Sequence, residues 1–220
     1  MNLEIKKRIL TSIFLLCLLI LMYLYTFIMI ISSIIIAVIA WIEFDALITK
    51  ILLKKNNRNK VLKFLYKFIS LLYLSSLVWL ILITESHQQN LKIYLLYSVL
   101  TAISTDIGGL VFGKIFKGRK LTRISPNKTI SGSLGSFIFS FSLIPFFFSV
   151  IGTHNLLTIF LITIIISLTS QLGDLFISYL KRKAKVKDTS DILPGHGGVL
   201  DRIDGIIFAI PIGVFLLNSL

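Results

Sequence analysis

The chain is poor in cysteine, histidine and charged side chains, and each shortage argues against a class of protein. One cysteine, Cys17, stands among 220 residues, so no disulfide can form within the chain. Three dispersed histidines and this single cysteine are too few for a tetrahedral zinc site. Only 15% of the residues are charged and the mean hydropathy is +0.90, a composition that soluble domains rarely have. The shortage of charge and the high hydropathy together predict a membrane protein.

What the chain has instead is long apolar stretches. Residues 9–42 and 129–173 contain no Asp, Glu, Lys or Arg for 34 and 45 residues, far beyond the ~20 residues that cross a bilayer as a helix. Each stretch therefore predicts a helical hairpin, and we expect the turns near 23–26 and 152–155. Further spans are expected at 64–84, 91–113 and 200–220. The predicted fold is an all-α, polytopic transmembrane helical bundle of about seven spans.

We expect a single integral-membrane catalytic domain over residues 1–220. Its parts are an N-terminal hairpin with a basic connector (1–63), spans three and four with a basic loop (64–128), and a second hairpin with a polar loop and the last span (129–220). Lys6, Lys7 and Arg8 precede the first apolar stretch, as in a signal peptide. No small-residue cleavage site follows, so this segment is expected to stay as a membrane anchor.

The net charge of +13 is gathered in four clusters that hold 22 of the 23 Lys and Arg residues. If successive spans alternate in direction, all four clusters reach the same side, which the positive-inside rule assigns to the cytoplasm. The basic loops lack the interleaved aromatic residues of a base-stacking surface, so we expect no nucleic-acid partner. A basic face there suits anionic lipid headgroups and a triphosphate.

The polar insert at 178–204 combines residue types that act on phosphates. Lys181 and Arg182 supply hydrogen-bond donors for phosphate oxygens. A glycine-rich turn at 195–198 can aim backbone N–H groups at an anion, and carboxylates such as Asp201 hold Mg²⁺. This combination predicts chemistry on phosphates.

The insert resembles the signature of the phosphatidate cytidylyltransferase (CDP-diacylglycerol synthase) family. The resemblance covers 27 residues of the 220, and many family members are longer. The matching positions are Ser178, Lys181, Arg182, Lys187, Asp188, Ser190, Leu193, Pro194, His196, Gly197, Gly198, Asp201, Arg202 and Asp204.

Two shorter elements add to the resemblance. The first is an aspartate-x-glycine ahead of a Gly-Lys pair, matched by Asp106, Gly108, Gly113 and Lys114. The second is serine-proline-x-lysine-threonine before a glycine, matched by Ser125, Lys128, Thr129 and Gly132. Ile130 and Ser131 depart from the aromatic and the acidic or amide residue that are common in the family.

The resemblance implies a nucleotidyltransferase that condenses CTP with phosphatidate to give CDP-diacylglycerol and pyrophosphate in phospholipid biosynthesis. It implies a bacterial cytoplasmic (inner) membrane location with the active site facing the cytoplasm. CTP, phosphatidate and membrane lipids are the expected partners, and a homodimer is left open. A cytidylyltransferase with another lipid phosphate as acceptor stays an alternative. A transporter is disfavoured because the charges gather at one surface rather than near the bilayer midplane.

We expect Mg²⁺ as the cofactor, with room for a second cation, held by Asp174 and Asp201 and by Asp204 as a third ligand or supporting group. Helical spacing would place Asp174, Ser178 and Lys181 on one face. Lys128, Lys181 and Arg182 are expected to bind phosphate groups. His196 is expected to orient or bind a phosphate group. The further substrate-binding candidates are Asp106, Lys114, Ser125, Thr129, Ser178, Lys187, Asp188, Gly197, Gly198 and Arg202.

Five acidic residues also have plainer interpretations. Asp106 could be a structural carboxylate paired with a lysine, although an aspartate within a span costs about 3 kcal/mol and is a functional candidate by default. Asp201 or Asp204 could cap a helix. Glu43, like Asp45, could anchor its helix at the interface or support the site.

Overall fold

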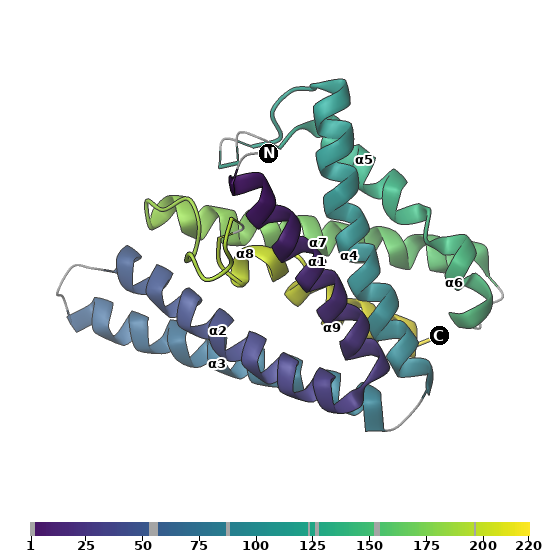
Figure 1. Cartoon of the computed structure of the whole chain (residues 1–220), viewed down its shortest axis with the longest axis horizontal. Coiled ribbons are helices and arrows are strands. Elements are labelled where there is room, and N and C mark those ends of the chain that lie inside the picture. The colour runs from purple at the N-terminus through teal and green to yellow at the C-terminus, as the bar shows by residue number, and fades with distance from the viewer. Residues whose placement is uncertain are drawn as a thin grey trace. The chain divides into compact units, whose positions relative to one another are not determined.

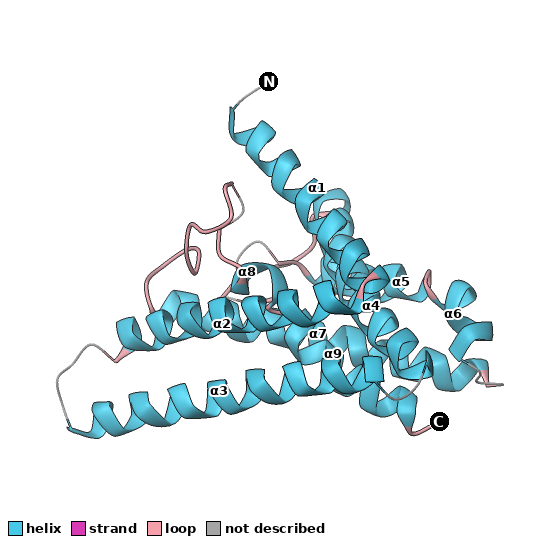
Figure 2. Cartoon of the chain, turned by 60° about the horizontal axis from the view of Figure 1, so that its bottom comes forward, coloured by secondary structure: helices cyan, strands magenta, loops and turns pink. Residues whose placement is uncertain are grey.

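The computed structural model describes residues 3–52, 57–86, 89–122, 124–125, 128–151, 155–195 and 197–220. Regular structure in these residues is helical, apart from isolated bridges between Lys120 and Thr129 and between Leu193 and Gly197 (Figure 2). The all-α prediction is confirmed. The helices are α1 (Leu3–Leu24), α2 (Thr26–Ile51), α3 (Asn57–Ser86), α4 (Gln89–Phe116), α5 (Ile130–Phe141), α6 (Ile144–Ile151), α7 (Leu156–Lys183), α8 (Leu200–Ile203) and α9 (Ile206–Asn218).

The helices of the described residues confirm an integral membrane protein with several spans. Five of them, α1, α2, α3, α4 and α7, are long and apolar enough to cross a bilayer. The pair α5 and α6 is bent by 47° and makes a sixth candidate if it is one broken span. The count of about seven stays a prediction.

The expected helix over 200–220 is interrupted. It is divided between α8 and α9 at Asp204–Gly205, where the Asp204 carboxylate accepts the N–H of Gly205 at 2.9 Å. At 13 residues, α9 by itself is shorter than the ~20 residues of a full crossing. Hydropathy marks the apolar stretch but not this break within it.

The predicted first hairpin is confirmed, with its break at Tyr25. This residue is extended (φ −122°, ψ 111°) between α1 and α2, inside the predicted turn. In contrast, α2 continues beyond the apolar stretch to Ile51, and α3 already begins at Asn57. The basic connector at the end of the 1–63 segment was expected as a loop or as a helix on the membrane. Its described residues are largely helical, since its lysines are good helix formers and it contains neither Gly nor Pro.

The chain divides into two compact units. One comprises Met1–Ile83 and Leu180–Ile203, and the other Thr84–Tyr179 and Asp204–Leu220. We call them the amino-terminal unit and the carboxy-terminal unit. Each is built from discontinuous segments, and α7 passes from the second into the first after Tyr179. The single catalytic domain stays a prediction.

In the carboxy-terminal unit, glycines let α4 and α5 pack closely side by side (Figure 1). A Cβ at Gly135 would lie 2.2 Å from Phe112 Cβ, and one at Gly108 would lie 2.6 Å from the Gly135 carbonyl oxygen. Small residues of this kind allow helix backbones to approach each other in membranes. Gly108, the glycine of the aspartate-x-glycine element, therefore has a packing role here.

A row of polar side chains joins α7 to its neighbours within the same unit. Residues 163, 167, 171 and 174 lie on one face of α7 by helical spacing. Side-chain hydrogen bonds between helices contribute roughly 0.6 kcal/mol each inside a membrane. The row therefore holds this face toward α4 and α5, and it ends at Asp174. The pairs are Tyr97–Thr163 (2.5 Å), Thr105–Ser167 (2.8 Å), Ser133–Gln171 (2.5 Å) and Lys128–Asp174.

Candidate active site

The loop between α7 and α8, residues 184–199, belongs to the amino-terminal unit and carries most of the family signature. We call it the signature loop. A turn is closed in it by a 2.8 Å hydrogen bond from the Leu193 N–H to the Gly197 carbonyl. Gly195 and Gly197 have φ values of +78° and +82°, a region that favours glycine. His196 lies outside the described residues, so its predicted role stays a prediction.

Asp201, in the short helix α8, binds both the loop and Lys181. Its Oδ1 accepts a 2.6 Å hydrogen bond from Lys181 Nζ. Its Oδ2 accepts the backbone N–H groups of Thr189 at 2.8 Å and Gly198 at 3.0 Å. The glycine turn was expected to donate its N–H groups to a substrate anion. In this structure the Gly198 N–H donates to the carboxylate of Asp201 instead.

The electrostatic balance at Asp201 favours the ionised form. Burial raises the pKa of this carboxyl, but the hydrogen bonds from Lys181, Thr189 and Gly198 and the charge of Lys181 outweigh burial and hold the pKa below the usual 3.8. The Asp201 side chain is only 4% exposed and that of Lys181 12%. The pair is therefore an ionised, largely dry contact at neutral pH.

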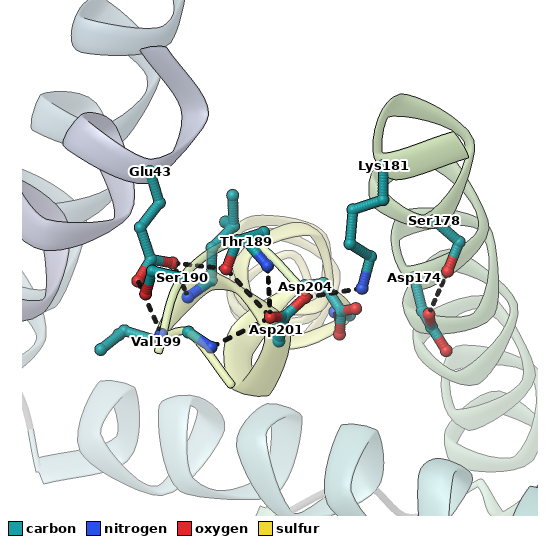
Figure 3. Close-up of polar contacts among 12 residues, drawn as sticks. Glu43, Asp174, Ser178, Lys181, Thr189, Ser190, Val199, Asp201 and Asp204 are labelled. Carbon is teal, nitrogen blue, oxygen red and sulfur yellow. Dashed lines mark hydrogen bonds and ion pairs between the residues drawn. The ribbon is translucent and has the colours of Figure 1, made fainter. Parts of the chain in front are cut away.

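Glu43 of α2 is the residue that sequence reasoning undervalued. It is 2% exposed and accepts hydrogen bonds from the Thr189 and Ser190 hydroxyls at 2.8 and 2.5 Å and from the Val199 and Leu200 N–H groups at 3.0 and 2.8 Å (Figure 3). Of the two interpretations left open for Glu43, support of the site is the one that these contacts favour. The local sequence gives no spacing signal, because the partners lie 146 to 157 positions away.

Asp174 organises a second polar cluster, in the carboxy-terminal unit. Its Oδ1 accepts the Ser178 hydroxyl at 3.2 Å, one helical turn along α7 (Figure 3), as the spacing predicts. Its Oδ2 forms an ion pair with Lys128. The two charged side chains are 22% and 28% exposed, so this pair has more access to its surroundings than the pair of Lys181 and Asp201.

The serine-proline-x-lysine-threonine element that contains Lys128 is built around a turn and a helix cap. The Thr129 hydroxyl accepts the Gly132 N–H at 3.0 Å and caps α5. The Ser125 carbonyl accepts the Lys128 N–H at 3.1 Å. Among the described contacts of this element, the side chain of Lys128 is the one that binds another candidate site residue, Asp174.

Asp204 is 6% exposed, and its side chain accepts the N–H at the start of α9. Close contact with α7 depends on Gly173, where a Cβ would lie 2.8 Å from the Asp204 carbonyl oxygen and 2.4 Å from the Phe208 ring. The backbone at Asp204 therefore passes directly beside the residue that precedes Asp174. This geometry favours a capping and supporting role for the Asp204 carboxylate.

The other charged candidate residues differ in exposure. Asp106 is half-buried in α4, whereas Lys114, Arg182, Lys187, Asp188 and Arg202 are exposed. Among the described residues, no three His, Cys, Asp or Glu side chains form a group that could hold a metal ion. The shared metal site of Asp174, Asp201 and Asp204 stays a prediction.

Comparisons with known proteins agree with the signature. The profile described as "Cytidylyltransferase family" matches residues 2–220. Among curated proteins, the phosphatidate cytidylyltransferase of Rickettsia bellii (strain RML369-C) is 40% identical over 169 residues, which are 71% of this chain and 70% of that protein. Those of Staphylococcus haemolyticus (strain JCSC1435) and Rickettsia felis (strain ATCC VR-1525 / URRWXCal2) are 46% and 44% identical over 129 and 126 residues.

The last two matches cover 58% and 51% of this chain and 48% and 53% of the relatives, so the chain matches about half of the length of these two proteins. The family profile nevertheless matches almost all residues of this chain. The chain belongs to the cytidylyltransferase family, as its signature loop predicts.

Proposed function

We propose that this chain condenses CTP with phosphatidate to form CDP-diacylglycerol and pyrophosphate. The family membership and the name that its relatives share, phosphatidate cytidylyltransferase, carry the proposal. The Lys181–Asp201 pair beside a glycine turn supports it, because such a site combines a cation, a carboxylate and backbone donors for phosphate chemistry.

In the proposed reaction, an oxygen of the phosphatidate phosphate forms a bond to the α-phosphorus of CTP. The bond from that phosphorus to the oxygen that bridges to the β-phosphate breaks, and pyrophosphate leaves with the electron pair. The phosphate monoester is already largely ionised at neutral pH, so no residue has to remove a proton. The protein's task is to align the two anions and to neutralise their charge.

Lys128, Lys181 and Arg182 are the proposed phosphate-binding residues. Lys181 and Lys128 each neutralise a carboxylate in this structure, and Arg182 is exposed at the end of α7. A triphosphate or a phosphate monoester carries more negative charge than a carboxylate and can therefore compete for an ammonium group. We therefore expect the two lysines to turn from Asp201 and Asp174 toward the triphosphate or the lipid phosphate when substrate binds.

Asp174 and Asp201 are the proposed Mg²⁺ ligands. The donor set fits, since Mg²⁺ is commonly bound by one or two carboxylates together with substrate phosphates. Oδ1 of Asp201 has a cation as its partner rather than a backbone donor, which leaves it exchangeable, while Oδ2 stays bound to the loop. When bound, Mg²⁺ would neutralise the phosphate oxygens around the α-phosphorus.

The proposed location is the bacterial cytoplasmic membrane, with the signature loop facing the cytoplasm. The clustering of basic residues supports this side by the positive-inside rule. A cysteine at Lys185, in a Cys17→Ser background, tests it, because Lys185 is exposed in the loop. An impermeant maleimide should label this cysteine only after the membrane is opened, and labelling of intact cells would reverse the topology.

The function itself is tested with purified protein, Mg²⁺, labelled CTP and a panel of lipid acceptors. We expect lipid-extractable label with phosphatidate and little with phosphatidylglycerol phosphate or a polyprenyl phosphate. If another acceptor took up as much label as phosphatidate or more, phosphatidate would not be the preferred substrate. The same panel run with each nucleoside triphosphate measures the nucleotide preference.

A further inference from the structure

One carboxylate of α2, that of Glu43, binds both ends of the segment 189–200, which contains the glycine turn of the signature loop. Glu43 Oε1 accepts the Ser190 hydroxyl and the Val199 N–H, and Oε2 accepts the Thr189 hydroxyl and the Leu200 N–H. Each oxygen thus takes one donor from 189–190 and one from 199–200. The residues in between include the Pro-Gly-x-Gly-Gly turn, so Glu43 closes the base of this turn.

The closed loop and the buried position of Glu43 depend on each other. The residue is 2% exposed, and a carboxylate is excluded from water at a high cost unless donors surround it. Gly198 makes the approach possible, because a Cβ at this position would lie 1.9 Å from Thr189 Oγ1 and 2.6 Å from Glu43 Oε2. A glycine of the signature is therefore required at this point by the contact with α2.

Thr189 connects Glu43 to Asp201. Its hydroxyl lies 2.8 Å from Glu43 Oε2 and 3.0 Å from Asp201 Oδ2, while its N–H donates to Asp201 at 2.8 Å. On the other side, Leu200, whose N–H donates to Glu43, directly precedes Asp201 in the chain. Glu43 thereby fixes the backbone on both sides of the Asp201 carboxylate.

We propose that Glu43 is a positioning residue for the cytidylyl transfer: it touches no substrate, but it holds the signature loop so that Asp201 Oδ1 and Lys181 point toward the reacting phosphates. This inference rests on the proposed function for its catalytic consequence. Its structural part, the dependence of the loop on Glu43, stands without it.

The test compares Glu43→Gln with Asp45→Asn in the full chain. Asp45 is the matched control because it is a carboxylate on the same helix whose ion-pair partner is Lys67 of α3, at 2.8 Å. In Glu43→Gln the new amide nitrogen faces two donors and accepts from neither, so the loop loses two of its four bonds. We expect the turnover number of Glu43→Gln to fall 10- to 100-fold and its half-saturating Mg²⁺ concentration to rise about tenfold, as for residues that orient metal ligands.

Amide hydrogen exchange supplies the readout that needs no activity. In Glu43→Gln we expect the N–H groups of Val199 and Leu200 to exchange at least about tenfold faster, together with those of Thr189 and Gly198, which donate to Asp201. Asp45→Asn should leave all four unchanged. Wild-type exchange at Thr189 and Gly198 in Glu43→Gln would overturn the proposal, and so would equal losses of activity in the two variants.

A second pair of variants decides the question if Glu43→Gln does not fold. Thr189→Val removes the hydroxyl between the two carboxylates and keeps the side-chain volume, whereas Thr189→Ser keeps the hydroxyl. We expect Thr189→Val to lose turnover about tenfold with faster exchange at Gly198, and Thr189→Ser to stay within about twofold of wild type. Equal behaviour of the two variants contradicts the proposal. Absence of cytidylyl transfer in the wild type would instead refute the proposed function and leave the exchange results valid.

Discussion

Lys181 Nζ donates to Asp201 Oδ1 at 2.6 Å, and the two side chains are 12% and 4% exposed. Both residues belong to the family signature, and α7 and α8 bring them together across the signature loop. The pair neutralises a carboxylate whose pKa is held low. Under the proposed function, this carboxylate would become a Mg²⁺ ligand when a triphosphate takes over Lys181.

Removal of the Asp201 charge is expected to abolish turnover and to destabilise the amino-terminal unit. Asp201→Asn leaves the buried ammonium of Lys181 without its partner, which costs about 3 kcal/mol for a pair this buried. Chemical unfolding of the detergent-solubilised protein measures the change. Asp191→Asn is the control, since Asp191 is exposed in the same loop. Full activity in Asp201→Asn would remove this residue from the proposed Mg²⁺ site.

The depressed pKa of Asp201 predicts where acid opens the loop. A carboxyl whose pKa is lower in the folded than in the unfolded protein stabilises the fold above the unfolded value and loses that contribution as the pH falls through the folded value. Because the folded pKa lies below 3.8, loop protection should be constant at neutral and mildly acidic pH and decrease only below about 4.

Hydrogen exchange at Thr189 and Gly198, normalised to the intrinsic rates, measures this pH dependence. In Asp201→Asn the part of the acid step that Asp201 causes should disappear, so the step should become smaller. A step near pH 6 in the wild type would show that another group controls the loop.

Lys128 is predicted to matter more for turnover than for stability. Its pair with Asp174 is about a quarter exposed, so Lys128→Met should cost less than about 1 kcal/mol. The loss of a phosphate-binding charge should lower the turnover number by about a hundredfold or more. Lys120→Met, an exposed lysine in the same basic loop, is the control and should keep both properties. A Lys128→Met variant with wild-type turnover would remove Lys128 from the site.

The α4–α5 contact predicts that substitutions at two glycines destabilise the fold to different extents. Gly135→Ala would force a Cβ to within 2.2 Å of Phe112, and such overpacking costs about 1–3 kcal/mol. At Gly113 the nearest atom is the Thr129 hydroxyl oxygen at 3.1 Å, so Gly113→Ala should change the unfolding midpoint much less. Equal midpoints for the two variants would contradict the close packing.

The sequence predicted those features of the fold that depend on local spacing. The 34-residue apolar stretch had to turn, and it does so at Tyr25, because one helix of that length exceeds the bilayer. The i, i+4 relation between Asp174 and Ser178 is likewise a property of the helix alone.

Two features could not be predicted in this way. Helices α2 and α3 extend past their apolar stretches, since hydropathy reports the thickness of the bilayer and not the end of a helix. Glu43 meets residues at 189–200 through tertiary packing, and no single-sequence pattern encodes a contact between positions so far apart. The proposed convergence of Asp174 and Asp201, which lie in different units, stays a prediction of the same long-range kind.

The most direct test of the central claim follows the two ends of the triphosphate. Purified protein in phosphatidate-containing vesicles is given Mg²⁺ and CTP that carries label on either the α- or the γ-phosphate. We predict that the α-label enters the lipid phase in a one-to-one ratio with released pyrophosphate, and that the γ-label stays in the aqueous phase. Transfer of the γ-label to lipid, or hydrolysis of CTP without a lipid product, would contradict cytidylyl transfer.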